Sequence, residues 1–259
     1  MRLLRAAAAA FAMYSRLPVP RVAWTGDVMA WALCCFPLVG IVVGAVLYLW
    51  LWLAAFLDFG GALTAAGAVL VPLAVTGGIH LDGLCDTADA LASHQSRERK
   101  LEILKDSHLG AFGAMACALY LLLTFALWWE VDGGDRLPLC LCLVPVLSRG
   151  LSGLAAFTMP NARGSGLLCA FTAPADQNKG RVVMGAWAVL AGGAMVWADP
   201  LRGGAGVAAA AVVFLYYLVM SRRQFGGITG DLAGYFLQLC ELGCLAAAAV
   251  APCVWERLV

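Results

Sequence analysis

The sequence predicts an all-α integral membrane protein, a polytopic bundle of about seven transmembrane helices with an N-terminal interfacial helix. Of its 259 residues, 63% are hydrophobic and only 13% are charged, whereas a soluble domain is about 45–50% apolar and about 25% charged. The mean hydropathy is +0.85, so most of the surface must face lipid rather than water. This composition excludes a soluble globule, a disordered chain and a nucleic-acid-binding module.

Long apolar runs define the predicted helices. A bilayer core about 30 Å thick needs about 20 apolar residues in a helix. Runs near that length cover residues 30–57, 61–79, 111–129, 137–157, 182–198, 204–220 and 232–254. Residues 2–13 are too short to span and no cleavage site follows them, so we expect a retained amphipathic segment on the membrane surface. In this interpretation residues 1–259 form one membrane-embedded domain.

The basic residues predict the orientation of these helices. With the N-terminus in the cytoplasm, all but three of the 17 lysines and arginines fall on the inner side. The exceptions are Arg136, Arg202 and Arg257. The positive-inside rule favours this orientation. The inner loops also carry nearly all the unusual polar residues, so we expect the function on the cytoplasmic face.

An acidic cluster directly follows the second apolar run. Asp82, Asp86 and Asp89 are spaced i, i+4, i+7, which places three carboxylates on one face of a helix. These like charges repel one another, and the nearest basic residues begin at Arg97. A hard divalent cation offsets this repulsion, because Mg²⁺ takes oxygen ligands from one or two carboxylates and from substrate phosphates. A solvated acidic helix face is the alternative interpretation.

Asp106 stands in a second polar segment, where the third apolar run begins. Lys105 and Ser107 flank it, and basic residues beside acidic metal ligands suit a polyphosphate substrate. Asp106 is therefore a candidate fourth metal ligand, or the base for an attacking hydroxyl. The alternative, a salt-bridged surface helix, suits the preceding Glu98 and Glu102.

A third polar patch, residues 222–231, precedes the last apolar run. Its glycines allow backbone N–H groups to approach a phosphate closely, and the patch ends in Asp231. Phosphoryl transfer between two bulky substrates needs groups on both sides of the phosphorus. We therefore expect residues 226–231 to fold back against Asp82 and Asp106. The alternative is that residues 229–231 only cap the final helix.

Three isolated ionisable residues complete the candidates. His80 precedes the acidic cluster by two residues, and its unperturbed pKa near 6.5 suits a general base; a satisfied interfacial histidine is the alternative. Arg149 lies late in the fourth run and needs an anionic partner. Glu241 lies within the last run, where an ionisable residue indicates function.

The ordered motifs resemble those of the cobalamin synthase family, the adenosylcobinamide-GDP ribazoletransferases, over almost the whole chain. The matching segments are residues 16–20, 36–40, 77–89, 101–110, 148–150 and 226–231. The most specific is the His-Leu-Asp-Gly-Leu-x-Asp-x-x-Asp block that starts at His80, followed by Lys-Asp-Ser-x-x-Gly from Lys105. The family usually has glycine after the third aspartate, where this chain has Ala90, a change that a helix accommodates.

The resemblance implies a Mg²⁺-dependent, multi-pass enzyme of the bacterial inner membrane with its active site facing the cytoplasm. It would transfer the phosphate-bearing corrinoid of adenosylcobinamide-GDP to α-ribazole or α-ribazole 5′-phosphate, releasing GMP in the last steps of cobalamin (vitamin B12) biosynthesis. No nucleic acid partner is expected, and the oligomeric state, a homo-oligomer included, stays open.

Two other functions remain as alternatives. A CDP-alcohol phosphotransferase also uses spaced aspartates, but its signature continues into Gly-x-x-x-Asp-x-x-x-Asp, a pattern that is missing after Asp89. A cation or metabolite transporter places its acids near the bilayer midplane, whereas here only Glu241 lies deep.

The site residues are assigned from the motifs and the resemblance together. The expected metal ligands are Asp82, Asp86, Asp89 and Asp106, with Asp82, Asp86, Asp106 and His80 as catalytic residues. The expected substrate-binding residues are Lys105, Ser107, Arg149, Arg223, Gly227, Thr229 and Asp231.

Overall fold

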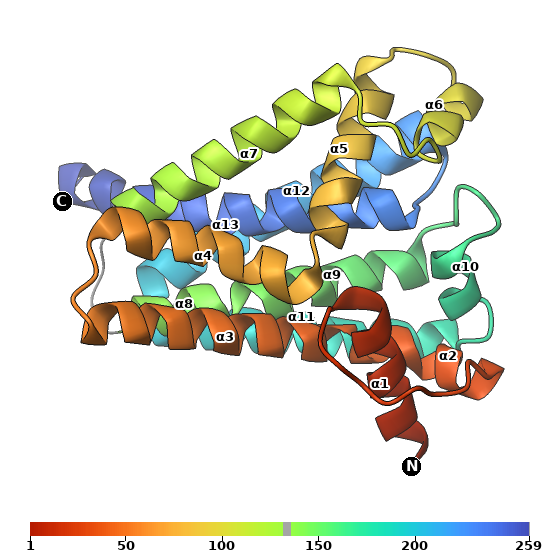
Figure 1. Ribbon diagram of the computed structural model, residues 1–259, viewed down its shortest axis with the longest axis horizontal. Helices are drawn as coiled ribbons and strands as arrows, with labels where there is room; N and C mark the ends of the chain where they lie inside the picture. The colour runs from red at the N-terminus through yellow and green to blue at the C-terminus, as the bar shows by residue number, and fades with distance from the viewer. Residues whose placement is uncertain (132–135, 259) are drawn as a thin grey trace.

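The chain folds into a bundle of long helices that run back and forth along one axis (Figure 1). The computed structural model describes residues 1–131 and 136–258, and the regular elements of this part are all helical. The helices along the axis are α3 (Phe36–Phe56), α4 (Gly61–Thr76), α7 (Ala111–Glu130), α8 (Leu137–Cys142), α9 (Val144–Thr158), α11 (Gln177–Ala198), α12 (Pro200–Phe225) and α13 (Gly230–Leu258). The predicted all-α membrane bundle is confirmed.

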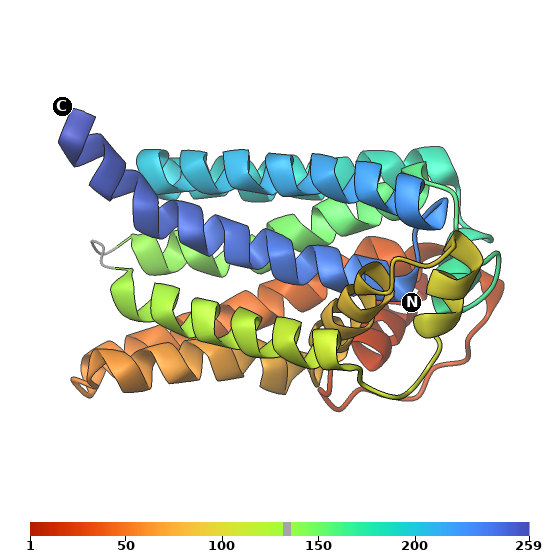
Figure 2. The same ribbon diagram turned by 90° about the horizontal axis from the view of Figure 1, so that it is seen from above.

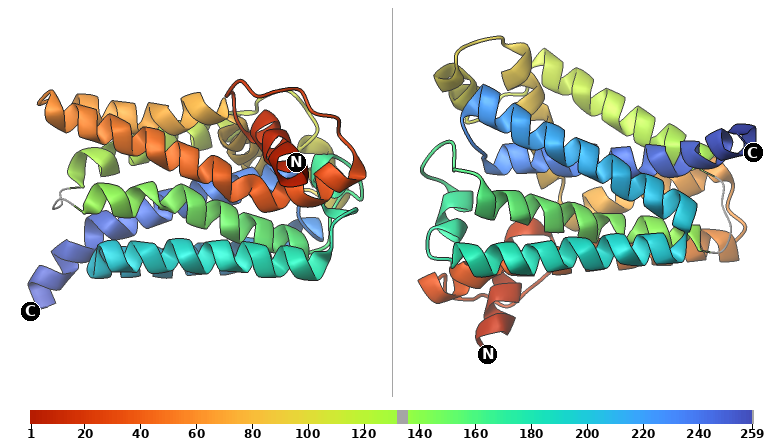
Figure 3. Two further views of the ribbon diagram at one scale, coloured as in Figure 1. Left: turned by 90° about the horizontal axis from the view of Figure 1, so that it is seen from below. Right: turned by 180° about the vertical axis from the view of Figure 1, so that it is seen from behind.

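Shorter helices gather at one end of the bundle, at the right in Figure 1. They are α1 (Arg2–Tyr14), α2 (Gly26–Ala32), the 3₁₀ turn η1 (Leu33–Cys35), α5 (Ile79–Ala92), α6 (Arg97–Ile103) and α10 (Leu167–Thr172). Together with the links 104–110, 159–166 and 226–229 they form what we term the polar end. Figures 2 and 3 show the N-terminus at this end and the C-terminus at the other. The predicted orientation requires the polar inner loops to lie at one end of the bundle, and the structure places them there.

Six helical segments within the described residues are long and apolar enough to cross a membrane. The remaining predicted span, residues 61–79, corresponds to α4, which has 16 residues and meets the same criterion only when α5 is added. The prediction of about seven spans is therefore confirmed.

The chain bends sharply between α4 and α5. The two axes differ by 94°, so α5 lies across the end of the bundle instead of prolonging the span (Figure 1). Gly77 and Gly78 form the bend with φ angles of +69° and +78°, a left-handed conformation that glycine adopts without steric cost. The Gly-Gly pair thus turns the acidic segment out of the direction of the spanning helices.

The N-terminal helix α1 also lies at the polar end, as the sequence predicts. Its small residues Ala6, Ala9 and Ala10 are buried, while Leu3 and Leu4 are exposed. A helix with exposed leucines, outside the bundle and at its end, suits the boundary between lipid and water.

Candidate functional site

Helix α5 presents the acidic cluster at the polar end. The carboxylate of Asp82 is exposed and those of Asp86 and Asp89 are partly buried. Neither the carboxylate of Asp82 nor that of Asp86 has a hydrogen-bond or ion-pair partner among the residues that the structure describes. These two aspartates, one helical turn apart, are therefore free to bind a ligand.

Asp86 shows the electrostatic cost of this arrangement. Burial raises the pKa of Asp86 to about 7, and the nearby charges of Asp82, Asp231 and Asp89 raise it as well, while Arg163 lowers it. Four carboxylates from α5 and α13 thus share one region with Arg163. A divalent cation bound there would relieve their mutual repulsion.

Asp89 has a structural contact that the sequence did not reveal. Its two carboxylate oxygens accept hydrogen bonds from the N–H groups of Gly110 and Gly113, each at 2.8 Å. Asp89 thereby satisfies two donors at the start of α7 and ties this helix to α5. Each oxygen keeps a further acceptor position, so the contact is compatible with the predicted metal role.

Asp231 approaches the cluster because α13 crosses α5 backbone to backbone. A Cβ atom at Gly83 would lie 2.6 Å from the backbone oxygen of Asp231, and one at Gly234 would lie 3.0 Å from that of His80. No larger residue fits at Gly83 without displacing a helix. The structure brings Asp231 to α5 as expected, but it does not bring Asp106 into the same group, and the loop before Asp231 does not have the predicted form.

The loop 226–229 is not a backbone cradle for phosphate. The N–H groups of residues 226–228 are all donated to backbone carbonyls of the protein, so the prediction that Gly227 brings a free N–H to a phosphate is wrong. Gly227 instead packs closely on Pro160. Thr229 caps α13, since its hydroxyl accepts a hydrogen bond from the N–H of Leu232 at 3.2 Å. The capping alternative therefore holds for Thr229, whereas Asp231 also reaches the cluster.

Arg163, in the link between α9 and α10, is a site residue that sequence reasoning missed. Its guanidinium forms an ion pair with Asp231 at 2.9 Å. The signal available in the sequence was an arginine followed by Gly164-Ser165-Gly166 in an inner loop. That signal is weak, because nothing local connects Arg163 with α5 or α13.

Asp106 lies on the exposed link between α6 and α7 and contacts His108. Its carboxylate accepts from the backbone N–H of His108 at 3.0 Å and lies 2.6 Å from Nδ1 of the ring. The hydrogen bonds from His108 hold the pKa of Asp106 below its usual value. The structure does not bring Asp106 among the charges that act on Asp86. Lys105, Ser107 and Arg223 are likewise exposed at the polar end.

Arg149 finds the predicted anionic partner inside the bundle. Its Nη1 donates to Glu241 Oε1 at 2.8 Å, and the hydroxyl of Ser148 donates to the same oxygen at 2.8 Å. Arg149 is only 1% exposed. Placing Arg149 among the substrate-binding residues of the acidic cluster is therefore corrected, because Glu241 already neutralises its charge.

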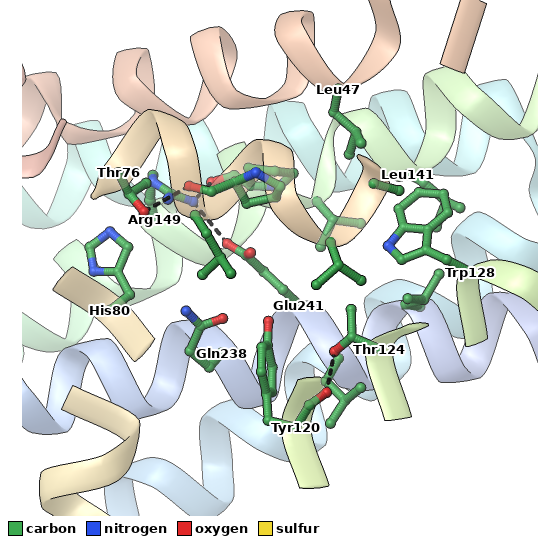
Figure 4. Close-up of a pocket in the computed structure, with 18 residues that line it drawn as sticks. Leu47, Thr76, His80, Tyr120, Thr124, Trp128, Leu141, Arg149, Gln238 and Glu241 are labelled. Carbon is green, nitrogen blue, oxygen red and sulfur yellow. Dashed lines mark hydrogen bonds and ion pairs between the residues drawn. The ribbon is translucent and has the colours of Figure 1, made fainter. Parts of the chain in front are cut away.

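His80 faces the same interior region. With Arg149, Gln238 and Glu241 it lines a largely apolar cavity of about 60 Å³, with room for a few water molecules (Figure 4). Its ring packs near those of Tyr14 and Phe36. Residues two apart on a helix point to nearly opposite sides, so His80 faces away from Asp82. The predicted role of His80 as general base at the cluster is not supported.

The acidic cluster fits a metal that the substrate helps to hold. Among residues 1–131 and 136–258, no three His, Cys, Asp or Glu side chains are arranged to bind an ion on their own. Mg²⁺ is usually bound by one or two carboxylates, with water and substrate phosphates completing the octahedron. The unpaired carboxylates of Asp82 and Asp86 match that donor set.

Fold and site together define a polytopic helical membrane protein that carries a cluster of carboxylates at its polar end. Comparison with known proteins identifies the family: residues 6–249 match the family model of cobalamin-5-phosphate synthase. The chain belongs to this family.

Curated relatives agree in name and in length. The adenosylcobinamide-GDP ribazoletransferase of Lachnoclostridium phytofermentans is 40% identical over 233 residues, covering 90% of this chain and 88% of the relative. The relative of the same name from Escherichia coli is 35% identical, and the match covers 90% of this chain and 94% of the relative. The one from Desulfitobacterium hafniense is 34% identical, and the match covers 90% of this chain and 92% of the relative. No solved structure matches the chain.

Proposed function

We propose that this protein is an adenosylcobinamide-GDP ribazoletransferase. It joins the corrinoid phosphate of adenosylcobinamide-GDP to a free ribose hydroxyl of α-ribazole, or of α-ribazole 5′-phosphate, and releases GMP. The observation that carries the proposal is the match to relatives of this name over nine-tenths of the chain. The unpaired carboxylates on α5 support it, because a diphosphate substrate with its cation suits them.

Asp82 and Asp86 are proposed to hold Mg²⁺, which when bound neutralises charge on the diphosphate and on the departing GMP. Lys105 and Arg223, exposed cations at the same end, are proposed to contact phosphate oxygens. Asp106 contacts His108 outside the group of charges that act on Asp86, and its lowered pKa makes it a weak base, so we assign it no proton-accepting role. Asp89 and Thr229 support the site by fixing the starts of α7 and α13.

The polar end is proposed to face the cytoplasm of a bacterial inner membrane. The support is the excess of lysine and arginine in the loops of this end. Cysteine labelling in intact cells tests the orientation: single cysteines at positions 97 and 179 should be shielded from an impermeant reagent. Labelling of either position from outside would contradict it.

Turnover by the purified protein in detergent tests the reaction. With adenosylcobinamide-GDP, α-ribazole and Mg²⁺, GMP and the joined corrinoid should appear in equal amounts, and chelation of Mg²⁺ should stop both. GMP release without any acceptor would indicate a hydrolase. CMP release from a CDP-alcohol, with no reaction of the corrinoid, would indicate the alternative phosphotransferase.

A further inference from the structure

Arg163 is the cation that the structure places against the acidic cluster. It binds Asp231 at 2.9 Å with 18% of its side chain exposed, and its charge also acts on Asp86. Asp82, Asp86, Asp89 and Asp231 are the anions of this region. One divalent cation together with Arg163 reduces the charge of this set from about −4 to about −1, so the repulsion of an anionic diphosphate would be much weaker.

The link that carries Arg163 is held by the loop before α13. The N–H of Ile228 donates to Pro160 and the N–H of Ala162 donates to Ile228, both at 2.9 Å. The side-chain oxygen of Asn161 accepts the N–H groups of Arg163 and Gly164, both at 2.9 Å. An irregular segment with this many hydrogen bonds fixes the backbone from which the guanidinium projects.

The guanidinium of Arg163 has N–H donors that the ion pair with Asp231 does not use. Arginine carries five N–H donors in a planar fork, and Nε of Arg163 is buried without a hydrogen-bond partner in the part of the chain that the structure describes. A buried donor without a partner is costly. A phosphate oxygen is the acceptor that an arginine fork matches best, often through two parallel hydrogen bonds.

We propose that Arg163 binds the diphosphate of the nucleotide-activated substrate, and that Asp231 is a positioning residue that holds the guanidinium toward the cluster. The inference rests on the proposed function for the identity of the substrate, but its chemistry requires only a diphosphate ester bound with a divalent cation. Arg163 then contributes positive charge from the α9–α10 link, while Asp82 and Asp86 act from α5. This arrangement supplies groups on two sides of the phosphorus.

Binding of inorganic diphosphate, measured by calorimetry on the purified protein with Mg²⁺, tests the inference without any turnover. Arg163→Ala should weaken binding about 10- to 100-fold, the range of a lost charge-assisted contact. Arg163→Lys keeps the charge and the ion pair with Asp231 but lacks the fork, so its loss should be intermediate. Lys179→Ala removes an exposed cation of the same end, paired with Asp176, and should change binding less than about twofold.

Kinetics and thermal unfolding separate ligand binding from a purely structural ion pair. In Arg163→Lys we expect a raised KM for adenosylcobinamide-GDP with an unchanged KM for α-ribazole and nearly unchanged thermal stability. Diphosphate affinity equal to wild type in both Arg163 variants would overturn the inference. If the wild-type protein binds diphosphate through Arg163 but joins no corrinoid, the inference stands and the proposed function fails.

Discussion

The molecule contains two concentrations of charge that are handled in opposite ways. Inside the bundle, Arg149 and Glu241 form a one-to-one pair, and Ser148 adds a third hydrogen-bonding group. At the polar end, the carboxylates of α5 and α13 gather around the single guanidinium of Arg163, and Asp82 and Asp86 have no partner of their own in the described residues.

The difference indicates which region is structural and which awaits a ligand. A charge pair in an apolar interior must be satisfied within the protein, because breaking it leaves an uncompensated buried charge. Carboxylates that repel one another reduce stability, and a bound cation would offset this cost. Ionisable residues within an apolar run, such as Glu241, are therefore poorer guides to chemistry in this chain than the unpaired acids at its end.

The largest expected effect is on catalysis. Asp82→Asn and Asp86→Asn keep the side-chain shape and remove the charge, so each should lower the transfer rate about 10²–10³-fold while leaving membrane insertion intact. Rates measured with saturating Mg²⁺ test this. More than about a tenth of the wild-type rate in both variants would contradict a metal site at these residues.

Breaking the interior pair should affect stability most. Glu241→Gln leaves Arg149 without a counter-ion, and we expect a loss of about 3–5 kcal/mol in the free energy of unfolding. Combining Glu241→Leu with Arg149→Met removes both charges and should recover much of this loss. Unfolding of the detergent-solubilised variants in denaturant measures both; a double variant less stable than the single one would show that the pair has another role.

Asp89 and Asp82 should respond differently to the same substitution. Asp89→Ala removes the acceptor for two N–H groups at the start of α7 and should cost about 0.5–2 kcal/mol, with faster hydrogen exchange at residues 110–113. Asp82→Ala removes an unpaired charge from a repelling set, so the metal-free protein should be unchanged or slightly more stable. Equal losses in the two variants would contradict the distinction.

The last prediction concerns pH. An unfolded aspartate has a pKa of about 3.9, whereas that of Asp86 is raised to about 7 in the folded protein. The folded state therefore binds more protons between these values, and its metal-free stability should fall as pH rises from about 4 to 7 and then level off. Asp86→Asn should flatten this part of the profile; an identical slope would assign the titration elsewhere.

Features with a regular period were predictable from the sequence. The spanning helices follow from apolar runs, and the aspartate face of α5 follows from its i, i+4, i+7 spacing. The return of Asp231 to α5 was predicted on a different basis, the need for groups on two sides of a phosphate. The resemblance to the family added the substrates, which no pattern of charge specifies.

Contacts between segments far apart in the chain were not predictable. Arg163 reaches Asp231 through an irregular link, and Asp89 binds the start of α7 across 21 residues. Arg149 and Glu241 are 92 residues apart, so the sequence showed that each needed explanation but not that they meet. The direction of His80 was likewise decided by the bend at Gly77 and Gly78, which determines the side of α5 that faces the bundle.

The bend between α4 and α5 also fixes how far the acids stand from the apolar helices. Joined as one straight helix, residues 61–92 would measure about 48 Å, against a hydrocarbon core of about 30 Å, and the last aspartates would protrude well into the water. Turned by 94°, α5 instead keeps its acids beside the ends of the long helices. A ligand that binds these acids is therefore held close to the ends of the apolar helices.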